Sequence, residues 1–425
     1  MLLGVEKTVV EDIDFDDETG DLVASVRPTG SMRNRCGVCQ RRSPRYDTGA
    51  GRRRWRALDA GTVQVHLEAE APRVSCRSHG VTVAAVPWAR HQVGHTRNFD
   101  AQVAWLATQT SKSAVTELMR IAWRTVGAII TRVWDDVEKL HDRFADLRRI
   151  GIDEISYKRG HKYVTVVVDH DSGRLVWAAA GRDKATLATF FDALGPERCA
   201  QITHVSADGA EWISLVVAER CPNAVRCADP FHVVRWASDA LDEVRRTAWN
   251  DARKAAQRNE AKRGRGRPAV DAPARSDSTL AVALKHSRYA LWKNPENLTE
   301  RQSAKLAWVV QTNPTLARAY YLKEGLRVIF KLPHDEAEEA LDKWVAWARR
   351  CRIPSFVKLQ RTIVQHRAEI LASIEHGLSN GRIESMNTKI RLITRVAFGF
   401  QSPDALIALA MLSLGGHKPV LPGRI

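Results

Sequence analysis

The sequence predicts a multidomain α/β protein in which a mixed sheet is interrupted by a helical insertion. Three observations lead to this prediction. Strand-like and helical patterns alternate over residues 148–236, the pattern is almost entirely helical over residues 230–375, and residues 31–95 are rich in arginine and contain three cysteines. The length agrees, because a chain of 425 residues is long enough for about two to four domains.

The composition indicates the kind of partner that the protein binds, but it says little about the fold. Lysine and arginine total 65 against 49 aspartates and glutamates, which gives a net charge of +16. A charge of this sign and size favours a polyanionic partner. The N-terminus is acidic where a signal peptide is basic, and no stretch reaches the roughly 18 apolar residues of a membrane span. We therefore expect a cytoplasmic, nucleoid-associated protein with no membrane partner.

Residues 1–95 are expected to form a zinc-binding module. Their first 30 residues alternate apolar and polar positions around an acidic turn at Asp16–Gly20, which predicts a pair of strands. Further on, two knuckles of the Cys-x-x-Cys type supply the candidate zinc ligands Cys36, Cys39, Cys76 and His79. Two such turns complete a tetrahedral structural site for Zn²⁺, and a reducing cytosol favours metal over a disulfide. Unligated cysteines beside an unrelated histidine are the alternative.

Residues 96–142 follow a helical pattern with one break near Ile121–Trp123. Ser113 is a suitable N-cap for the helix before the break. Two short helices around such a break predict a helix-turn-helix whose second helix enters the major groove. The residues expected to face DNA are Arg124, Thr125 and Arg132. A helical hairpin that belongs to a core gives the same pattern.

Residues 146–240 are expected to form the first part of the core. Their strands and helices follow the order β-β-β-α-β-α-β-α, which is the arrangement of nucleases and integrases of the ribonuclease-H type. A catalytic acid lies on the first strand of such a sheet, where the sequence has Asp153. A second acid belongs just beyond the fourth strand, where it has Asp208. A carboxylate on a buried strand is costly unless it is paired or bound to metal.

Residues 376–425 are expected to complete this core with helices. The helix after Ser379–Asn380 carries a third acid, Glu384. Helical spacing places Asn387, Arg391 and Arg395 on the same polar face. We expect these three side chains to contact DNA, because amide and guanidinium groups suit its phosphate backbone.

The residue types predict metal-dependent chemistry on DNA. Hard cations such as Mg²⁺ or Mn²⁺ take oxygen ligands, and two of them serve an in-line displacement at phosphorus. Taken singly, each acid has an ordinary explanation. Asp208 precedes a glycine as turn residues do, and Glu384 suits the first turn of a helix. The prediction rests on all three acids occurring together in their expected positions.

Two further residues lie where the predicted core ends. Asp229 and His232 follow the fifth predicted strand, close to the expected active site. Asp229 could be an accessory ligand or substitute for Asp208, although an acid before Pro230 also suits a helix cap. The residues favour the cap. For His232, contact with the scissile phosphate and a structural role are equally compatible with the sequence.

Residues 241–375 are expected to form a helical insertion with a basic linker at 258–279. The linker contains Arg-Gly-Arg-Pro, in which Arg265 and Arg267 resemble an AT-hook that enters an A·T minor groove. A solvated linker that makes nonspecific phosphate contacts is the alternative.

The chain resembles the ISL-three family of insertion-sequence transposases. The resemblance is carried by IGIDEIS, TVVVDHDSGRLVWAAAGR, VSADGAEWI, ADPFHVVRWASDALDEVRR and LSNGRIESMNTKIRLITRVAFGF. It implies a DDE-type enzyme with a ribonuclease-H-like core, in which Asp153, Asp208 and Glu384 match the three acids. It also implies the zinc module, the helix-turn-helix and the helical insertion. Two positions depart from the pattern: His79 stands where a cysteine is expected, and Pro230 where a basic residue is commoner.

The expected function is therefore DNA transposition. The protein would bind the terminal inverted repeats of its element and cleave the strands. It would then transfer them to target DNA, as a homodimer or a higher assembly on double-stranded DNA. The alternatives are a non-catalytic DNA-binding regulator with zinc and a helix-turn-helix, and a structure-selective nuclease of the same fold.

Overall fold

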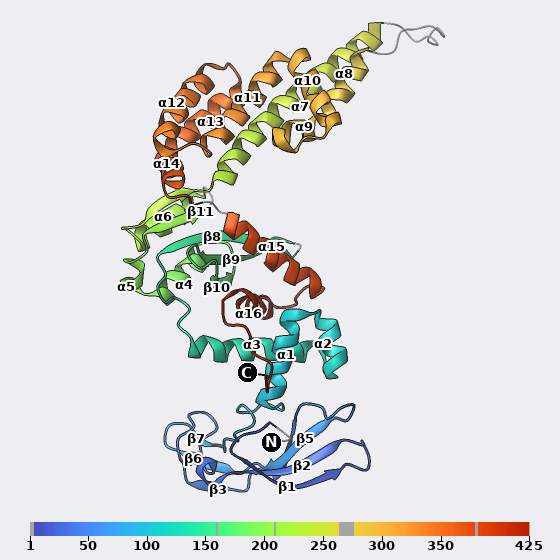
Figure 1. The fold of residues 1–425 in the computed structure, drawn as a ribbon, viewed down its shortest axis with the longest axis vertical. Coiled ribbons are helices and arrows are strands. Elements are labelled where there is room, and N and C mark those ends of the chain that lie inside the picture. The colour runs from blue at the N-terminus through green and yellow to red at the C-terminus, as the bar shows by residue number, and fades with distance from the viewer. Residues whose placement is uncertain (1–3, 159, 208–209, 263–275, 379–380, 425) are drawn as a thin grey trace, which may run out of the picture.

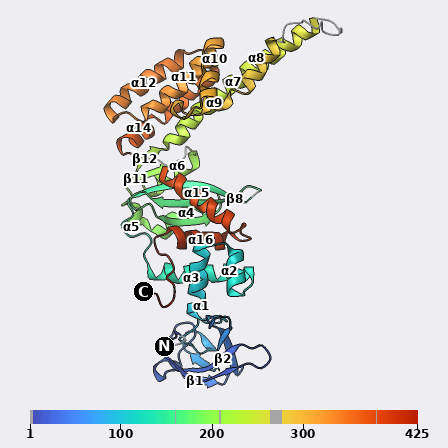
Figure 2. The ribbon, with the colours of Figure 1, turned by 45° about the vertical axis from the view of Figure 1, so that its right-hand side comes forward.

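The protein is an elongated molecule whose modules follow one another along its long axis (Figures 1 and 2). The computed structural model describes residues 4–158, 160–207, 210–262, 276–378 and 381–424. The N-terminal strands lie at one end, the sheet of the core lies in the middle, and a helical domain forms the other end (Figure 1). Among the described residues, no helix is both long and apolar enough to cross a bilayer.

The N-terminal module is built from short strands. They are β1 (Thr8–Phe15), β2 (Leu22–Pro28), β3 (Arg45–Asp47), β4 (Arg52–Arg56), β5 (Val65–Glu70), β6 (Arg73–Cys76) and β7 (Gly80–Val83). One sheet has the order β1-β2-β5-β4, and a second has the order β3-β6-β7. The antiparallel pair β1–β2 encloses the acidic turn, as predicted. Only the first sheet has a hydrophobic cluster, formed around Trp55 and Leu67, among the described residues of this module.

Three helices connect this module to the core. They are α1 (Arg97–Gln109), α2 (Lys112–Met119) and α3 (Trp123–Leu140). The predicted break lies between α2 and α3, where Arg120 adopts a left-handed conformation with φ 52°. The predicted N-cap at Ser113 was wrong by two residues. Ser111 caps α2 instead, because its side chain accepts a hydrogen bond from the Ala114 N–H.

The core contains a five-stranded mixed sheet with the order β10-β9-β8-β11-β12. Its strands are β8 (Arg149–Lys158), β9 (Lys162–Asp169), β10 (Leu175–Ala180), β11 (His204–Ala207) and β12 (Val225–Ala228). The predicted sequence of strands and helices is confirmed. β8, β9 and β10 form an antiparallel meander, and β11 pairs in parallel with β8 and β12. The connecting helices are α4 (Lys184–Leu194), α5 (Pro196–Cys199) and α6 (Glu211–Arg220).

Both faces of this sheet are covered, as the alternation of buried side chains along β8 requires. Ile150 and Ile152 point into a cluster with α4 and α6. Ile155 points the other way, into a cluster that contains α15 (Gly381–Val396), α16 (Pro403–Leu414) and the helices α1–α3. Asp153 alternates with Ile152 on β8, so it belongs to the face that α15 covers.

The helical insertion begins with one long helix, α7 (Pro230–Lys262). The predicted boundary at residue 240 therefore falls inside a helix, because no glycine or proline interrupts the chain between Phe231 and Lys262. The insertion continues with α8 (Ser276–Lys285), α9 (Arg288–Trp292), α10 (Glu300–Thr312), α11 (Pro314–Ile329), α12 (His334–Arg350), α13 (Pro354–Gln365) and α14 (Arg367–Glu375).

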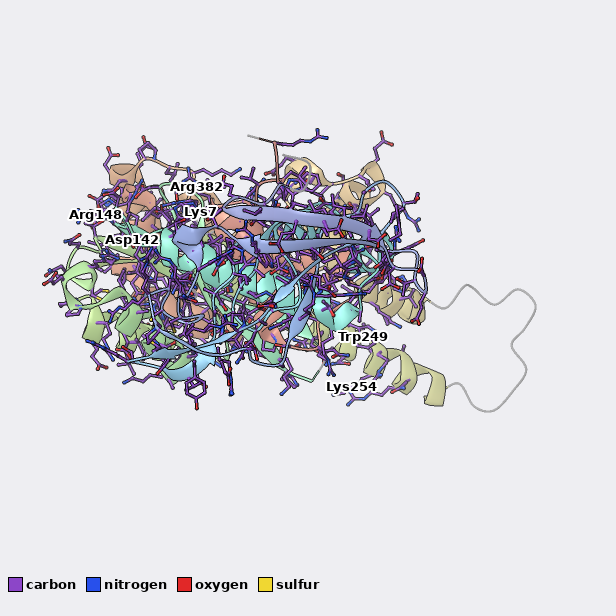
Figure 3. The ribbon with its side chains drawn as sticks, turned by 90° about the horizontal axis from the view of Figure 1, so that it is seen from below. Lys7, Asp142, Arg148, Trp249, Lys254 and Arg382 are labelled. Carbon is purple, nitrogen blue, oxygen red and sulfur yellow. The ribbon has the colours of Figure 1, made fainter. Side chains whose placement is uncertain are left out.

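Helices extend into both ends of the basic linker that was predicted at 258–279. Residues 258–262 belong to α7 and residues 276–279 to α8, whereas Arg265 and Arg267 lie outside the described residues. Seen along the long axis, Trp249 and Lys254 of α7 lie on the opposite side of the molecule from Arg148 and Arg382 (Figure 3). The helix α7 thus runs obliquely to the long axis, as Figure 1 also shows.

Candidate active site and nucleic-acid interface

Three neighbouring parallel strands are in register at Ile152, Ala207 and Ala228, each of which precedes an aspartate in the sequence. Ile152 of β8 pairs with Ala207 of β11, which in turn pairs with Ala228 of β12. In the sequence these three residues are followed by Asp153, Asp208 and Asp229. Asp208 itself lies outside the described residues. The register of Ala207 nevertheless means that the chain leaves β11 level with Ile152, one residue before Asp153.

Gly151 allows α15 to approach β8 closely. A side-chain carbon at this position would lie 2.1 Å from Cδ1 of Ile383 and 2.8 Å from Nε2 of His170. Real atoms do not approach so closely, so any larger residue would push the helix away from the strand. Ile383 is fully buried and directly precedes Glu384. The glycine therefore helps to set the distance between the helix that carries Glu384 and the strand that carries Asp153.

Asn387 connects the helix to the strand. Its Nδ2 donates a 2.6 Å hydrogen bond to Oδ2 of Asp153, across 234 positions of sequence. The Glu154 N–H donates to the other carboxylate oxygen at 2.7 Å. Asn387 is 4% exposed, so the structure places it in the acid cluster and not on the surface where DNA contact was expected. Its Oδ1 is buried without a hydrogen-bond partner among the described residues.

Negative charge accumulates around Glu384. Burial raises the pKa of its carboxyl above the usual value, and the charges of Asp229 and Asp153 raise it further. His232 and Arg391 act in the opposite direction but do not cancel the increase. Carboxylates that repel one another in this way form a favourable site for a divalent cation, which prefers several oxygen ligands.

Asp229 is a helix cap, as its sequence context favoured, and it also lies close to the other acids. One carboxylate oxygen accepts from the Phe231 N–H at 3.2 Å at the start of α7, so the residue is a helix cap. The other lies 2.6 Å from Nδ1 of His232. Asp229 is 2% exposed, and its charge is felt at Glu384. The cap thus lies within the acid cluster.

The four candidate zinc ligands come together in the N-terminal module. The ligand atoms of Cys36, Cys39, Cys76 and His79 all lie within 4.8 Å of one another. Cys39 Sγ and Cys76 Sγ are 3.7 Å apart, and His79 Nδ1 is 3.6 Å from Cys76 Sγ. Ligands about 2.3 Å from a tetrahedral ion lie about 3.8 Å from each other. The cluster therefore has the dimensions of a structural zinc site.

Local sequence explains the shape of this site. Cys76 ends β6 and His79 precedes β7, so one knuckle is the turn of a hairpin. The other knuckle contains Gly37, where a side-chain carbon would lie 2.1 Å from Nδ1 of His91 and 2.5 Å from the Val83 carbonyl oxygen. A glycine is required there because this knuckle packs against the end of β7 and the segment that carries His91.

The second helix of the helix-turn-helix presents its first turn to solvent. Arg124 is exposed and Thr125 half-buried at the start of α3. Arg132, which was expected to face DNA, is placed differently. Its Nε and Nη2 donate to the two carboxylate oxygens of Asp100 at 2.9 Å each. Asp100 is fully buried and also accepts from Arg90 at 2.6 Å.

Loss of Asp100 is expected to destabilise the helix-turn-helix. An Asp100→Ala substitution leaves the charges of Arg90 and Arg132 without their buried partner, which costs about 3–5 kcal/mol. Hydrogen exchange of residues 97–140 would measure this as a loss of protection. Asp135→Ala is the matched control, because Asp135 is exposed on α3 and such substitutions change stability by about 0.5 kcal/mol or less. Equal protection in both variants would contradict the structural role of Asp100.

Two of the arginines predicted to bind DNA do lie on an open surface. Arg391 and Arg395 are exposed on α15, one turn apart and on the same side as Glu384. Neither the contact between Gly151 and Ile383 nor the bond from Asn387 to Asp153 was predicted from the sequence. The glycine inside a strand pattern was the available signal for the first. The position of Asn387 directly after the apolar Met386 was the signal for the second.

Three family models match successive parts of this chain. A family model of the ISL3 group, described as a transposase, matches residues 150–410. Residues 84–134 match the helix-turn-helix domain of transposase family ISL3, and residues 33–79 match the zinc-finger of the transposases of IS204, IS1001, IS1096 and IS1165.

Two curated relatives cover most of the chain. The transposase for insertion sequence element IS1557 of Mycobacterium tuberculosis is 66% identical over 428 residues, which is 100% of this chain and 96% of the relative. The transposase for IS1001 of Bordetella parapertussis is 26% identical over 83% of this chain and 82% of its own length. The extent of the family match and of the identity shows that this chain belongs to the ISL3 family of insertion-sequence transposases.

Proposed function

We propose that this transposase cleaves the ends of its element and joins them to target DNA with two divalent metal ions, held by Asp153, Asp208 and Glu384 in a ribonuclease-H-like core. The observation that carries the proposal is the bond from Asn387 to Asp153. It ties the helix of Glu384 to the strand of Asp153 across 234 residues. Such convergence of acids from distant segments serves a metal site and has no use in a protein that only binds DNA.

The oxygen donors fit Mg²⁺ or Mn²⁺, which take carboxylate ligands. When bound, the ions would activate the attacking oxygen and stabilise the leaving oxygen of an in-line displacement. Asp153, on β8 at the centre of the sheet, would be a ligand of the ions together with Asp208 and Glu384. Asn387 would hold one of its oxygens in place, and Glu384 would close the site from above the sheet. No covalent link between protein and DNA is needed.

Asp229 and His232 would act as accessory groups. Asp229 is close enough to influence Glu384 electrostatically, and it holds the imidazole of His232 through Nδ1. A fixed imidazole beside a site for phosphate would supply a hydrogen bond or a positive charge to the scissile group. Asp229 would perform this role in addition to capping α7, because the two functions use different oxygens of its carboxylate.

DNA would reach this site through the modules that precede it. Arg124 and Thr125 at the start of α3 would contact the terminal inverted repeats in the major groove. Arg391 and Arg395 would hold the backbone near the acids, and Arg265 and Arg267 would add minor-groove or phosphate contacts. Two ends must be handled together, so the active form in the nucleoid would be a homodimer or a higher assembly on DNA.

The test is Mg²⁺-dependent cleavage of duplex DNA that carries the element's own ends. The full chain is expected to produce nicks with 3′-hydroxyl ends and, with a second duplex present, joined products. Tight binding without cleavage would favour the non-catalytic regulator instead. Cleavage without joining would favour the structure-selective nuclease.

Mg²⁺ is expected to stabilise the wild type against heat. A ligand at about 100 times its Kd adds about 2.7 kcal/mol of stability. Because the carboxylates around Glu384 repel one another in the folded core, the folded protein should bind Mg²⁺ more tightly than the unfolded chain. In a Glu384→Gln variant, this metal-dependent rise in Tm should be smaller. An equal rise in both proteins would contradict the assignment of Glu384 as a ligand.

Glu384→Gln is also expected to change the stability of the protein in the absence of metal. The raised pKa of Glu384 means that its ionised form is disfavoured in the folded state, so stability falls as the pH rises above the pKa of the unfolded carboxyl. An uncharged amide at this position has no such penalty. Without metal, Glu384→Gln should therefore be at least as stable as the wild type near neutral pH, and the difference should shrink as the pH is lowered.

A further inference from the structure

An exposed apolar patch lies at the C-terminal end of α15. Phe398 is 80% exposed, Leu392 59% and Val396 41%. Phe400, only two residues beyond Phe398, is buried in the core cluster at 6% exposure. One of the two aromatic rings therefore anchors the loop, while the other projects from the surface. The projecting ring adds little to folding because most of it stays in contact with water.

The backbone makes Phe398 an unfavourable choice for this position. The N–H of Phe398 bonds to the Arg395 carbonyl at 3.0 Å, and the N–H of Gly399 bonds to the Thr394 carbonyl at 2.9 Å. This is the Schellman pattern that ends a helix, and its left-handed residue is usually a glycine. Here that residue is Phe398, with φ 53°. A bulky side chain in this conformation is strained, and such strain concentrates at functional positions.

The charge around the patch indicates what it meets. Lys389, Arg391 and Arg395 are all exposed on the same helix. Arg391 and Arg395 lie seven and eleven residues after Glu384, so they share its side of α15. An apolar ring beside a row of cations suits DNA better than an apolar protein surface, because the cations would bind phosphates while the ring meets bases.

We propose that Phe398 inserts between adjacent base pairs of the duplex that lies along α15 and unstacks them. This rests on the proposed function, in which DNA passes Glu384. Phe398 lies fourteen positions after Glu384, just beyond the end of α15, which corresponds to a rise of about 21 Å at helical spacing. At about 3.4 Å per base step, the unstacked step would lie about six steps from the cleaved bond. Apolar wedges of this kind bend DNA and expose more of it to the protein.

The experiment is fluorescence of 2-aminopurine, a base analogue that brightens when it is unstacked. The analogue is placed in turn at each of the steps three to nine from the cleavage position of an element end. In a second series it is placed along an unrelated duplex that represents target DNA. Wild type should brighten the probe at one or two neighbouring steps in at least one series. The series that responds identifies whether the wedge acts on element ends or on target.

Four variants make the result specific. Phe398→Gly should abolish the brightening and raise the Tm, because glycine suits the left-handed position. Phe398→Leu should retain much of the brightening, since leucine is also an effective wedge. Leu392→Ala removes an exposed neighbour but should leave the signal unchanged. Asp153→Asn should also brighten the probe, so a failure of the proposed chemistry is separable from a failure of the wedge.

Two outcomes would overturn the proposal. The first is a probe that brightens as much with Phe398→Gly as with wild type, or that does not brighten with wild type in either series. The second is a change in the oligomeric state of Phe398→Gly without DNA, measured by light scattering. That change would assign the patch to contact between copies of this chain.

Discussion

Asp153→Asn is expected to reduce the rate of end cleavage by about 10³-fold or more, while the affinity for DNA stays the same or rises. The loss is large because Asp153 lies on β8, the central strand of the core sheet, and its negative charge would hold the cations that stabilise the charge developing during displacement. Asparagine keeps the shape of the side chain but removes the negative charge. Affinity does not fall, because one negative charge fewer faces the DNA backbone. Single-turnover cleavage and a gel-shift titration at constant salt would measure the two effects separately.

Asn387→Ala should have an intermediate effect in the same assay. Asn387 does not supply a charge, but it holds Oδ2 of Asp153 through a 2.6 Å hydrogen bond. Residues that orient a metal ligand typically change activity by about 10–100-fold. Higher Mg²⁺ should partly restore Asn387→Ala but not Asp153→Asn, because only the first keeps the carboxylate.

The matched control is Asp192→Asn. Asp192 lies on α4, on the opposite face of the same sheet, and its side chain is 60% exposed. The same chemical change there should leave cleavage unaltered. If Asp153→Asn cleaved as fast as Asp192→Asn, the acid cluster would be misassigned.

Removal of the zinc site is expected to have the second large effect, this time on structure. Wild type should contain about one zinc per chain, and Cys76→Ser should contain almost none. Structural zinc contributes about 10–16 kcal/mol of apparent binding free energy in small domains. The sheet β3-β6-β7 depends on this contribution, because none of its described residues belongs to a hydrophobic cluster of the structure.

The expected pattern of damage is local. Hydrogen exchange should show loss of protection in residues 36–48 and 73–84, while β1, β2, β4 and β5 keep the protection that Trp55 and Leu67 give them. Cys199→Ala is the control, since Cys199 is a buried free cysteine of the core. It should retain zinc. A zinc-free wild type with a fully protected β6–β7 hairpin would contradict the prediction.

Much of the architecture could be predicted from periodicity. The strands of the core were visible because apolar runs such as the one around Ile152 have strand length and are bounded by turn residues. The zinc ligands were visible because their spacing is local within each knuckle. Metal sites of this type depend on short-range geometry, which the sequence records directly.

What could not be predicted depends on packing between distant segments. Arg132 and Asp100 are 32 positions apart, and no pattern distinguishes an arginine that binds DNA from one that neutralises a buried acid. Helical spacing put Asn387 on the polar face of Glu384, yet a rotation of about 60° around the helix axis turns it toward Asp153. Helical spacing shows which residues share a face, but the position of the neighbouring strand determines which of them are buried against it.

The long helix α7 begins beside the acid cluster and extends far into the insertion. Its 33 residues span about 50 Å, and its first turn is held at the active site by the carboxylate of Asp229. A tilt of about 5° around that end would displace the far end by about 4 Å. The same tilt moves His232, less than one turn from the pivot, by less than about 0.5 Å. A change in the tilt of α7 would therefore displace the distal helices by several ångströms and leave the first turn beside Asp229 almost in place.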